Sequence, residues 1–125
     1  MKSFFRKRQE SFSFAIQGLK IALRQPNFKI MICIAVIVMG LAGFWGISRE
    51  EWLILLLIIG IVLSLEVLNT TVETLLDLVQ PQFSPKVKVV KDLVAGAVLI
   101  SILVSVTTGI IIFLPKFLNI LKTKN

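Results

Sequence analysis

The chain has 125 residues, 56% of them hydrophobic, with no histidine and a single cysteine. Its mean hydropathy of +0.90 is too high for a soluble domain of this size. Most of the formal charge of +7 lies before residue 30 or between two long apolar runs, which suits a membrane surface and argues against a nucleic-acid partner. Without histidine, catalysis would have to use carboxylates, lysine or a bound metal.

The first 26 residues contain apolar side chains at helical spacing, with polar side chains on the other side of the same helix. The apolar set is Phe12, Ala15, Ile16, Leu19, Ala22 and Leu23. This pattern predicts an amphipathic helix that lies on the membrane surface. Pro26 is expected to end it and to turn the chain into the membrane.

Three hydrophobic helices follow, within residues 30–47, 51–79 and 93–114. Each is close to or above the roughly 20 residues that cross a bilayer core. The prolines around residues 81–85 predict a tight loop, and Pro115 with Lys116 is expected to end the third helix. The predicted fold class is therefore all-α, a single membrane domain with a surface helix and three transmembrane helices.

Small residues recur every four positions in the third hydrophobic run, where they predict a face that another helix can approach closely. They are Ala97, Ser101, Ser105 and Gly109.

The distribution of lysine and arginine predicts the orientation in the membrane. Seven basic residues precede residue 31, and Lys86, Lys88 and Lys91 lie in or beside the second loop. The N-terminus and that loop are therefore expected to face the cytoplasm. Lys116, Lys122 and Lys124 weaken the bias, because three spans would place them outside.

Four polar side chains interrupt the second hydrophobic run. Glu66, Asn69, Glu73 and Asp77 are spaced three, four and four residues apart, so they form one stripe along a helix. A carboxylate near hydrocarbon is costly unless it faces a partner, a metal or water, so such a stripe favours function. For Asp77, a solvated helix end is an equally good interpretation; for Glu66, which follows a long apolar stretch, it is a poor one.

Lys91 and Asp92 begin the third run, and the short loop before them would bring both beside Glu73 and Asp77. Carboxylates can bind a divalent cation, lysine can neutralise phosphate, and one carboxylate can accept a proton. These are the groups that phosphoryl transfer needs. The alternative is a small channel or transporter subunit in which the stripe lines an ion or proton path.

Two segments carry a resemblance to a known family. The string Glu66-Val-Leu-Asn69-Thr-Thr-Val-Glu73-Thr-Leu-Leu-Asp77, followed by Lys91-Asp92-Leu-Val-Ala-Gly-Ala-Val-Leu, closely resembles the signature of the prokaryotic diacylglycerol kinase and undecaprenol kinase family. Residue types and spacing both match. The likeness extends to the sequence around Trp52, to the Phe-Leu-Pro that ends at Pro115 and to the overall layout, so it covers nearly the whole chain.

The resemblance implies a homotrimer in the bacterial cytoplasmic membrane, with active sites shared between subunits. It implies ATP-dependent phosphorylation, with Mg²⁺, of a lipid alcohol at the cytoplasmic face. The acceptor would be diacylglycerol or undecaprenol, and the Ala-Gly-Ala and Phe-Leu-Pro strings lean toward undecaprenol.

The same resemblance implies roles for single residues. Glu66 would be the general base, Asn69 would order the catalytic site, and Glu73 would bind the metal. The nucleotide would be contacted by Lys91, through its charge, by Asp92 and by the neighbouring acidic residues. The expected nucleotide-binding set is Lys91, Asp92, Glu73, Asp77, Phe14 and Lys7, the last two on the surface helix.

One position departs from the family pattern. Members usually carry a glutamate shortly before the first span as a second metal-binding carboxylate, and here the corresponding residue is Gln25. An amide offers a carbonyl oxygen but no charge, so metal affinity should fall. A catalytically weakened or silent relative of the kinase is therefore a further alternative.

Overall fold

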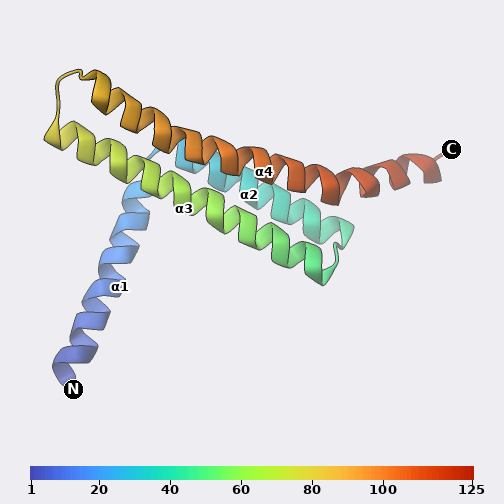
Figure 1. Ribbon diagram of the computed structural model, residues 1–125. Coiled ribbons are helices and arrows are strands. Elements are labelled where there is room, and N and C mark those ends of the chain that lie inside the picture. Colours follow the sequence, from blue (N-terminus) through green and yellow to red (C-terminus); the bar gives the residue numbers. More distant parts are fainter.

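The computed structural model describes all 125 residues, and they form four helices and no strand. Three of the helices lie side by side as an elongated bundle, and the N-terminal helix leaves one end of that bundle (Figure 1). The predicted all-α fold class is confirmed.

The N-terminal helix, α1 (Lys2–Ala22), is exposed along its length except at Ala22. Its internal contacts are local: the Arg8 guanidinium lies 4.9 Å from the centre of the Phe4 ring. No hydrogen bond or ion pair connects α1 to the two longest helices. The helix ends four residues before Pro26, so the expectation that Pro26 terminates it is wrong.

The second helix, α2 (Pro26–Trp45), begins at that proline. Proline suits the first helical position, because its missing N–H would have no intrahelical partner there and its φ is already helical. The helix ends at Gly46, which has φ 65° and donates its N–H to the Ala42 carbonyl. Glycine adopts this left-handed conformation without steric cost, so the helix stops two residues before the end of the apolar run.

The third helix, α3 (Arg49–Val79), has 31 residues and agrees closely with the predicted 51–79. A capping box starts it: the Ser48 hydroxyl accepts the Glu51 N–H at 3.2 Å, and the Glu51 carboxylate accepts the Ser48 N–H at 2.9 Å. These bonds satisfy backbone donors that the first turn would otherwise leave free. At 1.5 Å per residue α3 is about 47 Å long, more than the roughly 30 Å of a hydrocarbon core.

The fourth helix, α4 (Pro85–Thr123), follows the loop of residues 80–84, as expected. It begins before the apolar run and continues through Pro115, so the prediction that Pro115 and Lys116 end it is wrong. Proline inside a helix removes one hydrogen bond and bends the helix without always breaking it. Figure 1 shows the last part of α4 turning away from the line of the preceding turns.

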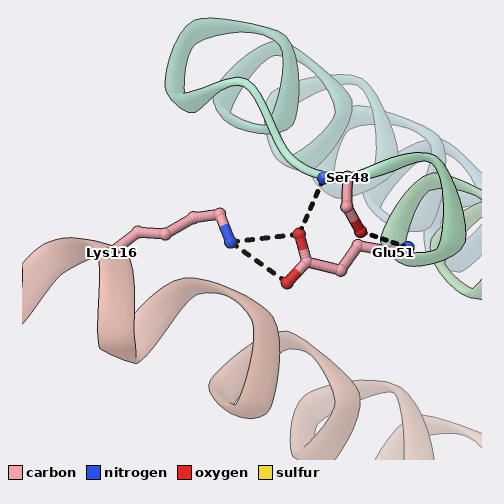
Figure 2. A network of polar contacts seen from close by, with 3 residues as sticks. All are labelled: Ser48, Glu51 and Lys116. Carbon is pink, nitrogen blue, oxygen red and sulfur yellow. Dashed lines mark hydrogen bonds and ion pairs between the residues drawn. The ribbon is translucent and has the colours of Figure 1, made fainter.

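Glu51 also connects α3 to α4. Its two carboxylate oxygens each lie 3.0 Å from the Lys116 ammonium, and both side chains are partly buried. Figure 2 shows Ser48, Glu51 and Lys116 forming one network, which we call the clamp. A cap at the start of α3 is thereby attached to a residue 65 positions later in the chain.

The closest packing is between α3 and α4, with α2 lying against α3. Of the predicted small-residue face on α4, Ser101 is buried and Ser105 and Gly109 are partly buried, whereas Ala97 is exposed. A small apolar core consists of Ala42, Ile47, Leu55 and Ile112.

Three helices, α2, α3 and α4, are long and apolar enough to cross a membrane. Only 12 of the 125 residues are buried, and most of the large apolar side chains on these helices are exposed. Such a surface has to be covered by lipid or by other protein, as expected for a membrane protein.

Candidate active site

The polar stripe on α3 divides into a buried half and an exposed half. Glu66 is 3% exposed and Asn69 is 8% exposed, whereas Glu73 and Asp77, nearer the helix end, are exposed. The three- and four-residue spacing keeps all four on one side of α3. The stripe therefore runs from solvent into the bundle, and Glu66 is its innermost group.

Two polar side chains besides Asn69 act on the Glu66 carboxyl. The Asn27 side chain, in the first turn of α2, is close enough to interact with it, and the Glu73 carboxyl, two turns along α3, acts through its charge. Asn27 was not among the residues expected at the site. Its place two positions after Gln25, just before an apolar run, is the one sequence feature that could have indicated it.

Asn69 carries an unsatisfied acceptor. Its Oδ1 atom is buried and has no hydrogen-bond partner, and the indole Nε1 of Trp45 is the only other buried side-chain atom in this condition. Trp45 is the last residue of α2, and the centre of its ring lies 5.7 Å from the centre of the Phe113 ring. A buried amide oxygen without a partner costs free energy, so a ligand that supplies a donor or a cation would be stabilised there.

Lys91 is brought to the stripe as predicted. Its ammonium lies 2.6 Å from Asp77 Oδ1, which joins the start of α4 to the end of α3. Asp92 is next along α4 but pairs with Lys88 on its own helix and is exposed. The structure thus places Lys91 and Asp77 together and leaves Asp92 facing solvent beside them.

Three of the expected site residues precede α2, and two of them lie on α1. Gln25 is partly buried in the turn between α1 and α2, where it precedes Pro26. Lys7 and Phe14 are exposed on α1, which extends away from the bundle (Figure 1). Within one chain, these two side chains have no contact with the polar stripe.

The oxygen-bearing side chains do not form a complete metal site. No group of three or more carboxylate, imidazole or thiolate side chains lies close enough together to hold an ion. What the chain offers is two carboxylates, Glu66 and Glu73, and the unpartnered amide oxygen of Asn69. Mg²⁺ prefers hard oxygen ligands and is usually held by one or two carboxylates together with substrate phosphates and water, so this donor set suits Mg²⁺ bound with a nucleotide.

An apolar groove adjoins the buried end of the stripe. It has a volume of about 420 Å³, is lined by α2, α3 and α4, and extends from Asn27 to Phe113. Thirteen of its 16 lining residues are hydrophobic, so the groove suits a hydrocarbon chain better than a polar ligand. Because Asn27 lies at the Glu66 end, the groove and the stripe are continuous.

These features define a multi-pass α-helical membrane protein with a buried carboxyl group beside an apolar groove. The family model of prokaryotic diacylglycerol kinase matches residues 13–113. The chain is 37% identical over 108 residues to the undecaprenol kinase of Bacillus subtilis (strain 168), covering 86% of this chain and 88% of that protein. It is 33% identical over 113 residues to the diacylglycerol kinase of Synechocystis sp. (strain ATCC 27184 / PCC 6803 / Kazusa), covering 89% of this chain and 65% of that one.

The chain belongs to the prokaryotic diacylglycerol kinase family, and it is a membrane lipid kinase.

Proposed function

We propose that this protein transfers the γ-phosphoryl group of ATP, with Mg²⁺, to the hydroxyl of undecaprenol at the cytoplasmic face of the bacterial cytoplasmic membrane. The observation that carries the proposal is the buried Glu66 carboxyl, with the unpartnered Asn69 oxygen one turn away, inside the segment that matches the kinase family. Diacylglycerol is the alternative acceptor.

In the proposed reaction, the lipid oxygen forms a bond to the γ-phosphorus, and the bond from that phosphorus to the β–γ bridging oxygen breaks. Glu66 accepts the proton of the lipid hydroxyl, so the products are a lipid phosphate and ADP. Burial keeps Glu66 out of bulk water and at the depth at which a lipid alcohol arrives. Mg²⁺, held by Glu73 and the phosphates, supplies positive charge that offsets the charge of the transferring group.

The groove supports a lipid acceptor with a long apolar chain. A hydrocarbon tail lying between Phe113 and Asn27 would present its hydroxyl to Glu66. Confinement in the membrane and in the groove would hold the two reacting groups together, which lowers the entropic part of the barrier. Undecaprenol is preferred here because the undecaprenol kinase relative is more similar and is covered over more of its length.

The nucleotide phosphates are proposed to enter the site beside Lys91 and Asp77. Lys91 is paired with Asp77, and both lie at the solvent end of the stripe. An arriving nucleotide would compete with Asp77 for the Lys91 ammonium, because phosphate carries more negative charge than one carboxylate. Asp92, exposed beside Lys91, is proposed to contact the nucleoside.

A homotrimer would complete the site. The apolar surface of α2, α3 and α4 is largely uncovered, and α1 leads away from the stripe of its own chain. Lys7 and Phe14 could then contact the nucleotide or lipid of a neighbouring subunit. Gln25 is proposed as a weak, uncharged metal ligand, which would make the enzyme more dependent on the Mg²⁺ concentration than a relative with glutamate there.

The test is transfer of labelled phosphate from ATP to undecaprenol or diacylglycerol by the full chain in lipid nanodiscs, with and without EDTA. The proposal expects labelled undecaprenyl phosphate as the main product, and its loss when EDTA removes Mg²⁺. Faster labelling of diacylglycerol would show that diacylglycerol, and not undecaprenol, is the preferred acceptor. No labelling of either lipid would contradict kinase activity, and a proton flux in vesicles without ATP would favour the channel alternative.

A further inference from the structure

The last part of α4, residues 114–123, has no role in the site described above. The match to the family model ends at residue 113, so the family model does not describe this segment. It is nevertheless helical up to Thr123. Pro115 is its second residue and lies inside α4. Figure 1 shows the last part of α4 turning away from the line of the preceding turns.

The segment is amphipathic. Its apolar side chains recur at the positions i, i+3, i+4 and i+7 that place them within about 100° of one another on a helix. They are Leu114, Phe117, Leu118 and Leu121, each 46–48% exposed. The opposite side carries Lys116, Asn119 and Thr123, whereas Lys122 lies at the edge of the apolar side and Ile120 is an apolar residue outside it.

The length of α4 places this segment beyond the hydrocarbon core. Lys91 and Lys116 are separated by 25 residues, or about 38 Å of helix, which already exceeds the roughly 30 Å of the core. Lys91 lies at the Asp77 end of the bundle and Lys116 at the clamp end. Residues after Lys116 therefore lie in or beyond the headgroup layer on the side opposite the polar stripe.

Three lysines lie within the segment or directly after it, and one of them has an ion-pair partner. Lys116 is paired with Glu51 in the clamp, whereas Lys122 and Lys124 have no ion-pair partner. If α4 simply continued into water, four large apolar side chains would be hydrated. Lying in the interface buries these side chains and brings the two free lysines to the level of lipid phosphates.

We propose that residues 114–123 form an interfacial anchor that binds anionic phospholipid headgroups at the membrane surface opposite the polar stripe. Lys122 and Lys124 contact the phosphates, and the side with Phe117 and Leu121 enters the acyl boundary. The clamp fixes where this anchor begins, because it holds Lys116 against the start of α3. This inference does not depend on the kinase reaction.

The test compares two labelled positions on opposite sides of the segment. In a Cys33→Ser background, Leu121→Cys and Asn119→Cys are each labelled with an environment-sensitive fluorophore, and the full chain is reconstituted in nanodiscs. Quenching by a water-soluble quencher is then measured with zwitterionic lipid alone and with added anionic lipid. We expect Leu121→Cys to be the better shielded position, and the anionic lipid to increase this shielding.

Charge variants test whether Lys122 and Lys124 cause the binding to anionic lipid. Lys122→Gln with Lys124→Gln should lower the equilibrium constant for interfacial binding by about fivefold per lysine, and Lys122→Arg with Lys124→Arg should retain it. Equal quenching at positions 119 and 121 would overturn the proposal. Shielding that is the same in zwitterionic and anionic nanodiscs, and that the charge variants do not change, would also overturn the proposal. That result would indicate contact with another copy of the chain.

Discussion

Two carboxyl groups on α3, Glu51 in its first turn and Glu66 near its middle, have opposite surroundings. At the clamp, the partly buried Glu51 accepts hydrogen bonds from the Ser48 backbone and from Lys116, so its oxygens have partners within the chain (Figure 2). Glu66 is buried, and an amide and a second carboxyl group lie within its reach. Asn69, one turn away, has an oxygen with no partner.

This difference separates a structural site from a functional one. A carboxylate whose bonds are all made within the protein contributes to stability and has little left to offer a ligand. A buried carboxyl and amide without a full set of partners are costly to the fold, and a membrane protein keeps such groups where a substrate or ion completes them. We therefore propose that Glu51 serves stability and that Glu66 serves the chemistry.

The largest expected effect is that of Glu66→Gln. The substitution keeps the shape of the side chain but removes the proposed proton acceptor, so phosphate transfer should fall by about 10²–10⁴-fold, the range for loss of a general base. Initial rates with saturating ATP and lipid measure it. Glu50→Gln is the matched control, because Glu50 is exposed on the same helix at the clamp end, and it should keep the wild-type rate.

Asn69→Leu should lower activity less and leave the fold intact. Replacing the amide removes a group that helps order the site, and misplacement of reacting groups can cost up to about 10²-fold in rate. The thermal unfolding midpoint should stay the same or rise, because a buried unpaired acceptor is removed. A clear fall in the midpoint with unchanged activity would make Asn69 a structural residue.

Glu51→Gln should affect stability and not chemistry. Loss of its negative charge weakens the bonds to Lys116, so the unfolding midpoint should fall by a few degrees while the rate per folded molecule is retained. A double-mutant cycle with Lys116→Met tests the pairing, since the second substitution should add little once the first is present.

The smallest effect is expected for Asp77→Asn. The pair with Lys91 is solvent-exposed, so its loss should cost no more than about 1 kcal/mol of stability. Because Lys91 is freed and not removed, KM for ATP should change by only a small factor and kcat should be retained. A loss of kcat comparable to that of Glu66→Gln would instead place Asp77 in the catalytic machinery.

Several of these features could be predicted from the sequence because they depend on local periodicity. The bounds of α3, the side shared by Glu66 and Asn69 and the pairing of Lys91 with Asp77 all follow from helical spacing and a short loop. Helical geometry relates residues that are close in the chain, so these predictions needed no knowledge of tertiary packing.

Other features depend on packing that no local pattern contains. The Lys116–Glu51 contact spans 65 positions, and each residue alone resembles an ordinary helix end. Pro115 normally signals termination, but α4 continues past it to Thr123. Asn27 reaches Glu66 only because α2 packs against α3. Amphipathicity alone also could not predict the direction in which α1 leaves the bundle.

The most direct test compares the same substitution at two positions of α3, one in its first turn and one near its middle. Glu66→Gln and Glu51→Gln are prepared in identical nanodiscs, and phosphate transfer from ATP to undecaprenol and the thermal unfolding midpoint are measured for both. We predict that Glu66→Gln abolishes phosphate transfer and leaves the unfolding midpoint unchanged. Glu51→Gln should retain phosphate transfer and lower the unfolding midpoint. Transfer by Glu66→Gln at the wild-type rate would contradict it.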